Sequence, residues 1–332
     1  MNTAPTTAHT SAPRPVYLDC DTGIDDSMAL AYLLRSPEVE LVGVGTVSGN
    51  VDAARAARNT LDLLALAGRP DVPVAVGAHH PLAGEFAGPV PHIHGENGVG
   101  GIALAPSDRR PVAEDAATLL GRLAREHAGA LSVITVGPTT NIATALRRDP
   151  ELPGLVRDVT TMGGAALVPG NVTAVAEANV RNDPEAAAEL IAAPWDVMLV
   201  PLDVTLENQL TEADREALLG ADDPLAQAVG AMLDHYFGFY TPLYGRRGCA
   251  LHDPLAAAIA VGSVQPTRAP AVELVIDTTH GPGRGQTIAD LRGQRLGPVD
   301  RPGVRTRVVL DTDRPLGPLL VERLLGTARA AA

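Results

Sequence analysis

Short apolar runs alternate along the chain with longer segments whose apolar positions repeat at helical spacing. The short runs predict strands at Val16–Cys20, Glu40–Val47, Val72–Val76, Leu131–Val136, Val159–Met162 and Val197–Val200. The longer segments predict helices at Asp25–Leu34, Asp52–Leu66, Val112–Glu126, Thr140–Arg147, Pro184–Ala192, about 211–240, and Pro254–Val261. Strands that alternate with helices are typical of βαβ units, so we expect a mainly parallel sheet.

The C-terminal part of the chain has a different pattern. Runs at Val272–Ile276, Thr287–Leu291 and Thr306–Leu310 predict a few strands joined by turns, and Pro315–Ala328 predicts a final helix. No internal repeat and no Pro/Ser-rich linker divides the chain. We therefore expect one α/β domain over residues 15–332, an open Rossmann-like sheet flanked by helices, after a loose tail over residues 1–14.

Two connections, residues 77–101 and 163–181, are longer than the topology requires. An open parallel sheet binds ligands at the carboxyl ends of its strands, and long loops there often carry function. The sequence therefore places its candidate site at this edge of the sheet.

Composition narrows the function classes. The 332 residues carry a net charge of -13, which disfavours nucleic acid and anionic membranes as partners, and every cationic side chain apart from histidine is arginine. No apolar run approaches the ~18 residues that would span a bilayer, and the N-terminal residues lack the pattern of a signal peptide. The two cysteines, Cys20 and Cys249, are typical of free thiols. We expect a cytoplasmic protein.

Four carboxylates lie within eight residues, at Asp19, Asp21, Asp25 and Asp26. Near the end of a buried strand such like charges repel one another and resist desolvation. A hard cation relieves both problems, since Ca²⁺ and Mg²⁺ prefer oxygen ligands. A helix N-terminus explains Asp25 or Asp26, but it does not explain the two acids on the strand side.

Two metal-binding families match this cluster poorly. A calcium-binding helix-loop-helix loop needs Gly at its sixth position and Glu at its twelfth, where this chain has Ile24 and Leu30. A Mg²⁺-dependent phosphatase of the haloacid dehalogenase type would use Asp19 as nucleophile and Asp21 as acid. It would also need a lysine, which this chain lacks, but it stays open as an alternative.

A third family matches along nearly the whole chain, over roughly residues 15–328. The stretch Asp19–Asp26 resembles the D-x-D-x-G-x-D-D signature of nucleoside hydrolases of the inosine-uridine-preferring type. Further segments resemble the family in the same order: Thr46–Asn50, Ile93–Gly98, Val136–Asn141, Met162–Gly164, Gly170–Asn171, Glu177–Asn179, Asp183–Ala187 and His252–Pro254. The resemblance implies hydrolysis of the N-glycosidic bond of nucleosides to ribose and a free purine or pyrimidine.

The resemblance also implies one Ca²⁺ per subunit, which binds the ribose and a water. Its ligands would be Asp21, Asp26, Asp253 and the main-chain carbonyl of Val136, with Asp21 as the general base for that water. His252 would be the general acid for the leaving base. Asp253-Pro254 also has the pattern of a helix N-cap, as does Asp183-Pro184, to which we assign only the structural role.

The substrate contacts that the resemblance implies come from several segments. The ribose would contact Asp25, Asn50, Met162, Asn171, Glu177 and Asn179, and the base would contact His94, Tyr240 and Tyr244. Tyr240 also fits a packed helix face together with Tyr236, Phe237 and Phe239. Arg246 and Arg247 border the base or face solvent. The resemblance implies a homodimer or homotetramer, and a non-catalytic nucleoside-binding protein is a further alternative.

Overall fold

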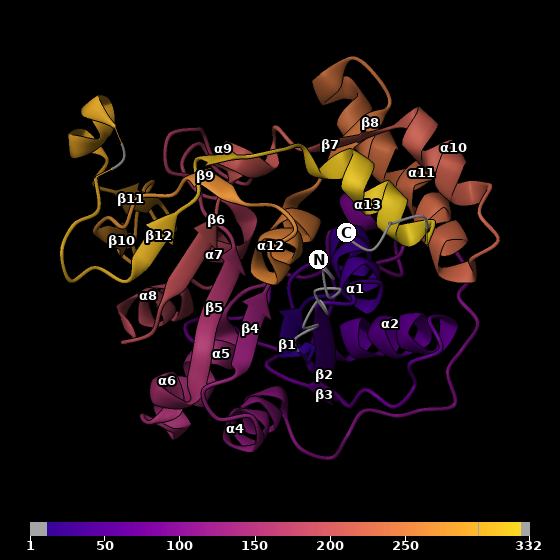
Figure 1. Ribbon diagram of the computed structural model, residues 1–332, viewed down its shortest axis with the longest axis horizontal. Coiled ribbons are helices and arrows are strands. Elements are labelled where there is room, and N and C mark those ends of the chain that lie inside the picture. Colours follow the sequence, from indigo (N-terminus) through magenta and orange to yellow (C-terminus); the bar gives the residue numbers. More distant parts are fainter. Residues whose placement is uncertain (1–11, 298, 327–332) are drawn as a thin grey trace, which may run out of the picture.

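The structure, a computed structural model, describes residues 12–297 and 299–326, and its centre is a seven-stranded parallel sheet (Figure 1). The strand order is β12-β6-β5-β4-β1-β2-β3. In chain order these strands are β1 (Arg14–Cys20), β2 (Val39–Thr46), β3 (Val74–Val76), β4 (Leu131–Thr135), β5 (Val156–Met162), β6 (Val197–Val200) and β12 (Thr306–Val308). The predicted α/β architecture is confirmed.

Side-chain alternation along β1 shows how the sequence builds a core on each face of the sheet. Val16 and Leu18 belong to the core formed with α1 (Ile24–Leu34), α2 (Ala53–Leu66) and α12 (His252–Val261). Tyr17, between them, belongs to the core formed with α4 (Ala116–Glu126), α5 (Thr140–Arg148) and α8 (Pro184–Ala192). Because helices cover both faces, the strands read as nearly continuous apolar runs.

Several predicted boundaries differ from the structure. The helical segment predicted at about 211–240 is two helices, α10 (Glu212–Leu219) and α11 (Pro224–Tyr244), because Asp223 caps a new helix with Pro224 at its first position. The helix predicted from Val112 begins only at Ala116, after the N-cap Asp115. The two long loops contain short helices, α3 (Pro91–His94) and α7 (Ala178–Asn182).

The C-terminal strands do not all form one ribbon. β12 adds to the edge of the main sheet, parallel to β6, whereas β10 (Leu274–Ile276) and β11 (Thr287–Ala289) form a separate antiparallel pair. The final helix, α13, spans Leu316–Leu324, and the rest of its predicted range beyond residue 326 lies outside the described residues. The predicted tail lies outside them up to residue 11, and β1 already includes Arg14.

Smaller elements complete the fold. They are α6 (Leu152–Leu155), α9 (Leu202–Thr205), the 3-10 helix η1 (Arg292–Leu296), and the antiparallel pairs β7 (Gln209–Thr211) with β8 (Gly248–Ala250) and β9 (Pro266–Arg268) with β13 (Asp311–Thr312). Among the described residues, no helix has both the length and the apolar character needed to cross a membrane.

α1 packs against α12 and is fixed at its C-terminal end by α13 (Figure 1). Arg323 of α13 donates hydrogen bonds to both carboxylate oxygens of Glu38, at 2.7 and 2.8 Å, and to Ser36 Oγ at 2.6 Å. Its guanidinium also lies 4.8 Å from the centre of the Tyr32 ring. These contacts fix the helix whose other end carries Asp25 and Asp26.

Candidate functional site

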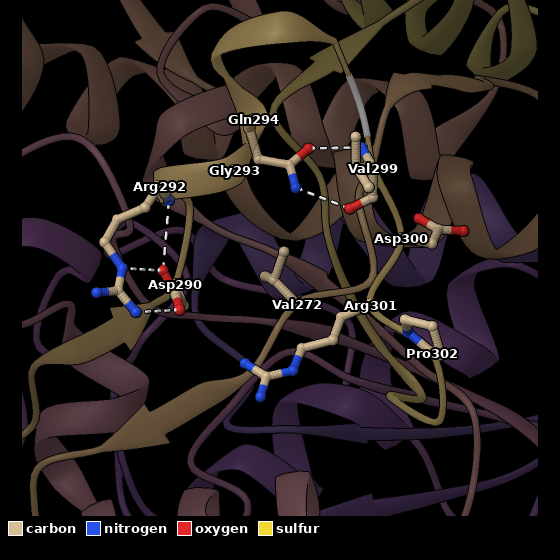
Figure 2. Close-up of a pocket in the computed structure, with 9 residues that line it drawn as sticks. All are labelled: Val272, Asp290, Arg292, Gly293, Gln294, Val299, Asp300, Arg301 and Pro302. Carbon is tan, nitrogen blue, oxygen red and sulfur yellow. Dashed lines mark hydrogen bonds and ion pairs between the residues drawn. The ribbon is translucent and has the colours of Figure 1, made fainter.

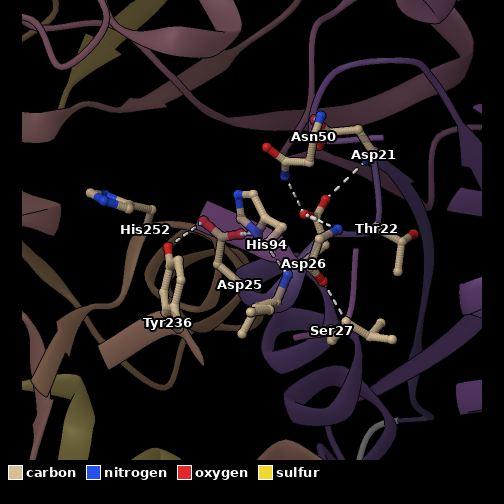
Figure 3. A network of polar contacts seen from close by, with 12 residues as sticks. Asp21, Thr22, Asp25, Asp26, Ser27, Asn50, His94, Tyr236 and His252 are labelled. Atoms are coloured by element: carbon tan, nitrogen blue, oxygen red, sulfur yellow. Dashed lines mark hydrogen bonds and ion pairs between the residues drawn. The ribbon is translucent and has the colours of Figure 1, made fainter. Parts of the chain in front are cut away.

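The predicted acidic residues meet at the carboxyl edge of the sheet. Asp21 follows β1, Asn50 follows β2, and Val136 follows β4, so these three lie together because parallel strands end at the same edge. Asp25 and Asp26 occupy the first turn of α1 (Figure 3). Asp253 occupies the first turn of α12. The four acids are all buried.

Asp26 closes the turn between β1 and α1. Its Oδ1 accepts the backbone N–H of Asp21 at 3.0 Å, and its Oδ2 accepts the N–H of Gly23 at 2.8 Å and the side-chain amide of Asn50 at 2.9 Å (Figure 3). The carboxylate therefore replaces the missing partners of the N-terminal end of α1 and fixes the position of Asn50.

The carboxylate of Asp21 lies in a slot between two glycines. A Cβ on Gly49 would lie 2.1 Å from Oδ2 of Asp21, and a Cβ on Gly137 would lie 2.8 Å from Oδ1. The backbone N–H of Asn50 donates to Oδ2, whereas the buried Oδ1 has no hydrogen-bond partner. One oxygen is thus oriented by the backbone, and the other is free to act on a ligand.

Asp25, Asp26 and Asp253 can each offer an oxygen such that all three atoms lie within 4.8 Å of one another. The sequence pattern predicted Asp253 as the N-cap of α12, but the N-cap is Leu251, whose backbone N–H donates to the carbonyl of Asn208 at 2.8 Å, and the helix starts at His252. Among the described residues, its buried carboxylate accepts no hydrogen bond. It therefore remains available to a cation.

The electrostatics of this cluster fit a bound cation. Burial, and then the charge of Asp26, holds the pKa of Asp21 well above its usual range, and burial with the charge of Asp25 does the same for Asp253. Burial also raises the pKa of Asp26 to about 6. Oδ1 of Asp25 is a second buried oxygen without a partner. Such a set of oxygens suits a hard divalent ion.

The predicted ribose-binding loop is held by hydrogen bonds between its side chains and backbone groups. Glu177 caps α7, and its two oxygens accept the N–H groups of Asn179, Gly164 and Val180 at 2.8, 2.8 and 3.2 Å. The side-chain amide of Asn179 donates to the carbonyl of Val136 at 2.8 Å and to that of Met162 at 3.2 Å. Asn171 is exposed and accepts the N–H of Ala178. The loop thereby contacts the carbonyl predicted as a metal ligand.

His94 reaches the cluster from the first long loop. Its Nδ1 accepts the N–H of Ile24, the first residue of α1, at 3.0 Å, and lies 3.8 Å from Oδ1 of Asp25. This hydrogen bond places the proton of the neutral ring on Nε2. Burial is the main cause that lowers the pKa of His94 to about 4. His94 is therefore a neutral donor, whereas the other histidines of this loop, His79, His80 and His92, are exposed.

His252 is part of a chain of aromatic and hydroxyl groups. Its Nδ1 lies 2.7 Å from Oγ1 of Thr205, and its Nε2 lies 2.7 Å from the hydroxyl of Tyr240. The ring of Tyr244 stacks on that of Tyr240, with 5.3 Å between the ring centres, and its buried hydroxyl has no partner. Tyr236 donates to Oδ2 of Asp25 at 3.0 Å (Figure 3). α11 thus supplies both packing and polar contacts.

Asp19 points away from the acids that follow it. It is fully buried and accepts hydrogen bonds from the hydroxyl of Tyr17 at 3.0 Å and from the side-chain amide of Asn141 at 3.1 Å. Burial raises its pKa to about 7. A carboxylate enclosed in this way cannot reach a phosphoryl group, so the phosphatase alternative loses its nucleophile.

Sequence reasoning missed the two slot glycines, Thr205 and the contact between Tyr236 and Asp25. For the contact between Tyr236 and Asp25 a signal was available, because Tyr236 is four residues from Tyr240 and therefore lies on the same face of the helix. Two arginines that were left open are held by other groups: Arg247 pairs with Glu212 and Asp234, and Arg246 donates to Gln209. Asp183 caps α8, and both cysteines are buried and free, as predicted.

A separate cleft lies beside η1, toward the β12 edge of the sheet (Figure 2). Its charged groups are already paired: Arg292 with Asp290, Arg301 with Glu273, and the side-chain amide of Gln294 with the backbone of Val299. Its lining is Val272, Asp290, Arg292, Gly293, Gln294, Val299, Asp300, Arg301 and Pro302. It brings together none of the predicted site residues.

Comparison with known proteins gives one consistent result. The family described as inosine-uridine preferring nucleoside hydrolase matches residues 16–316. The chain is 33% identical over 317 residues to probable uridine nucleosidase 2 of Arabidopsis thaliana, which covers 94% of this chain and 98% of that protein. It is 37% identical over 245 residues to the pyrimidine-specific ribonucleoside hydrolase RihA of Salmonella typhi, covering 74% and 78%.

Solved structures agree with the sequence relatives. A plant nucleoside hydrolase superimposes with a TM-score of 0.87 at 32% identity, over 94% of this chain and 99% of that chain. A purine-preferring ribonucleoside hydrolase from Gardnerella vaginalis superimposes with a TM-score of 0.86 at 33% identity, over 94% and 98%. The relatives' names thus include both pyrimidine and purine preferences.

The buried acids predict how the stability of the chelator-treated protein depends on pH. Burial raises the pKa of Asp19 and Glu177 to about 7 and that of Asp26 to about 6, so near neutrality the folded chain holds protons that the unfolded chain releases. The free energy of unfolding should rise by on the order of 1 kcal/mol as the pH falls from about 8 to about 6.5.

Thermal unfolding followed by circular dichroism across this range measures the effect. Below about pH 6.5 the lowered pKa values of His94 and His252 act in the opposite sense, because the unfolded histidines take up protons first. A melting temperature that falls steadily from pH 8 to 6.5 would contradict the raised carboxyl pKa values.

Proposed function

The chain belongs to the inosine-uridine preferring nucleoside hydrolase family, and we propose that its acidic cluster cleaves the N-glycosidic bond of ribonucleosides with Asp21 as general base. The chain is a nucleoside hydrolase by this membership. The observation that carries the proposal is the slot around Asp21, in which one carboxylate oxygen is fixed by the backbone and the other is buried without a partner.

Asp21 accepts the proton of the attacking water. Its Oδ2 is held by the N–H of Asn50, and the glycine slot fixes the plane of the carboxylate, so Oδ1 is directed at whatever occupies the cluster. A base oriented in this way requires no reorganisation as the proton moves. The water then attacks C1′ of the ribose, the C1′–N bond breaks, and the buried carboxylates stabilise the positive charge that develops on the sugar.

The cofactor that we propose is Ca²⁺, held by Asp21, Asp26, Asp253 and the carbonyl of Val136. Carboxylate and carbonyl oxygens are its preferred ligands, and the unpartnered oxygens together with the raised pKa values support such an ion. When bound, the ion would offset the charge of the acids and polarise the oxygens that it contacts. Asp25 lies close enough to Asp26 and Asp253 to share in this role.

The ribose is bound by residues that surround the cluster. We propose that Asp25 and Asn179 accept and donate hydrogen bonds at the 2′- and 3′-hydroxyls, with Asn50 and Met162 beside the ring. Asn171 and Glu177 would bind the 5′-hydroxyl. The tie from Asn179 to Val136 supports this arrangement, because it joins a sugar-binding residue to a proposed metal ligand. Orientation by several hydroxyls supplies binding energy remote from the reacting carbon.

The leaving base takes a proton from the pair formed by His252 and Tyr240. Thr205 occupies Nδ1 of His252, so the proton shared between Nε2 and the Tyr240 hydroxyl is the one available to the departing base. Tyr244, stacked on Tyr240 with a free hydroxyl, and His94, with a proton on Nε2, would contact the base. We further propose that the protein is a homodimer or homotetramer and is located in the cytoplasm. Light scattering on the purified protein would measure the oligomeric state.

Removal of the metal tests the proposal directly. Treatment with a chelator should abolish release of the base from a panel of inosine, uridine, cytidine, adenosine and guanosine, and added Ca²⁺ should restore it. An Asp21→Ala variant loaded with Ca²⁺ should lose about 10²–10⁴-fold in kcat, because the base for the water is gone. Base release is followed by absorbance or chromatography.

Asp71→Asn, at an exposed acid paired with Arg69, is the matched control and should retain full turnover. Full activity of the chelated enzyme would reject the metal. Nucleoside binding by the unaltered chain without any turnover would identify a non-catalytic binding protein.

His252 is tested by varying the leaving group. His252→Ala should lower kcat for natural nucleosides by about 10²-fold but leave the hydrolysis of an activated aryl riboside nearly unchanged, because a nitrophenolate departs without a proton. Steady-state kinetics on both substrates give the comparison. Equal losses on the two substrates would contradict the acid role.

The glycine slot gives a further prediction. Gly49→Ala would place a methyl group against Oδ2 of Asp21 and displace the carboxylate, which should lower kcat by about 100-fold in a chain that still folds. Gly154→Ala, where an added Cβ meets nothing within 4 Å, is the control. Unchanged kinetics for Gly49→Ala would show that the slot does not position Asp21.

A further inference from the structure

The connection after β4 and the first two residues of α5, together called the 136–141 loop, are fastened at both ends of this segment to one residue, Asp19. At its start, the N–H of Val136 donates to the backbone carbonyl of Asp19 at 2.9 Å. At its end, the side-chain amide of Asn141 donates to Oδ1 and Oδ2 of Asp19 at 3.2 and 3.1 Å. Main chain and side chain of Asp19 together therefore fix where this loop begins and ends.

Asn141 extends the same tie to the neighbouring strands. Its amide nitrogen also donates to the carbonyl of Thr46 at 3.0 Å, at the end of β2, and its Oδ1 accepts the N–H of Ala78 at 2.8 Å, just beyond β3. A Cβ on Gly77 would lie 2.2 Å from that Oδ1, so the chain passes close to Asn141. One buried amide thus joins the ends of three strands to the loop that follows the fourth.

The loop held in this way carries two parts of the site. Val136 offers the carbonyl that we assign to the metal, and Gly137 forms one wall of the slot around Asp21. A shift of the loop would move both parts at once. Asp19 is fully buried, and its side chain faces Tyr17 and Asn141, so its carboxylate reaches the Val136 carbonyl and Gly137 through Asn141 and the loop.

We propose that Asp19 is a positioning residue that sets the affinity of the metal site through Asn141 and the 136–141 loop. This inference rests on the proposed function. The hydrogen bond from Asn141 carries the effect, and the negative charge of Asp19 does not. Residues that orient metal ligands from behind commonly change metal affinity by about 10–100-fold when they are altered.

Substitutions at position 19 separate the hydrogen bond from the charge. Asp19→Ala removes the acceptor for Asn141. Asp19→Asn keeps it, because the amide oxygen can accept from Asn141 while the amide nitrogen donates to the hydroxyl of Tyr17, which can still donate to the carbonyl of Ala116. We expect the Ca²⁺ dissociation constant to rise about 10–100-fold for Asp19→Ala and to stay within about threefold for Asp19→Asn.

Substitution of Asn141, the partner of Asp19, gives an independent test. Asn141→Asp changes one group and places a carboxylate against Asp19 and the carbonyl of Thr46, so the dissociation constant should again rise about 10-fold or more. Adding Asp19→Asn to it restores a donor between the two positions. The double variant should therefore bind Ca²⁺ more tightly than Asn141→Asp alone, which a simple loss of stability does not predict.

Tyr17→Phe is the matched control. It removes the other hydrogen bond to the same carboxylate, whose donor is not part of the loop, so it should lower the melting temperature and leave the dissociation constant within about threefold. Isothermal titration calorimetry with Ca²⁺ measures the affinity without reference to turnover. The protein is first treated with a chelator, and circular dichroism confirms that it is folded. If Asp19→Ala yields no folded protein, the Asn141 variants decide the question.

Two results would overturn the inference: wild-type Ca²⁺ affinity in folded Asp19→Ala or Asn141→Asp, or an equal loss of affinity in Tyr17→Phe. Nucleoside turnover by the unaltered chain is measured in parallel and tests the proposed function separately. An active wild-type enzyme with unaffected variants refutes only the role of Asp19, whereas an unaltered chain that neither binds Ca²⁺ nor turns over refutes the proposed function first.

Discussion

Burial of several like charges at one point is the constraint on which the site depends. Asp21, Asp25, Asp26 and Asp253 are all removed from water, and among the described residues His94 is the one base at ion-pair distance from them, 3.8 Å from Asp25. Isolated carboxylates at such depth are strongly unfavourable. The fold meets this cost with backbone N–H donors, the N-terminal ends of α1 and α12, and the cation that we propose. The packing of α1 against α12 keeps the four acids together.

Much of the fold could be predicted because periodicity is a local property. The strands that are buried on both faces read as apolar runs, and Asp183-Pro184 marked the start of α8 correctly. The same reasoning did not divide the segment over 211–240 into its two helices, although Asp223-Pro224 carried the same signal there. The place of β12 at the edge of the main sheet could not be predicted, because its pairing with β6 joins segments that lie far apart in sequence.

The site divides in the same way. The order of motifs predicted which residues converge, and the acids do meet where β1 and β4 end and α1 and α12 begin. The sequence could not show that Leu251, and not Asp253, is the N-cap of α12, since this depends on the hydrogen bond from the N–H of Leu251 to the distant carbonyl of Asn208. Nor could it show the slot around Asp21, because a close approach between Gly49 and a carboxylate exists only in three dimensions. The resemblance therefore predicts which residues form the site, whereas the hydrogen-bond partners of these residues follow only from the structure.

Asp21, which follows β1, and Asp25 and Asp26 of α1 lie far from Asp253 of α12 along the chain. During translation, at roughly 5–20 residues per second, the first three acids leave the ribosome on the order of ten seconds or more before Asp253 is made. The nascent chain therefore carries the first three acids before α12 exists to enclose them. Synthesis of α12, rather than collapse of the segment that precedes it, is what allows the native pocket to form.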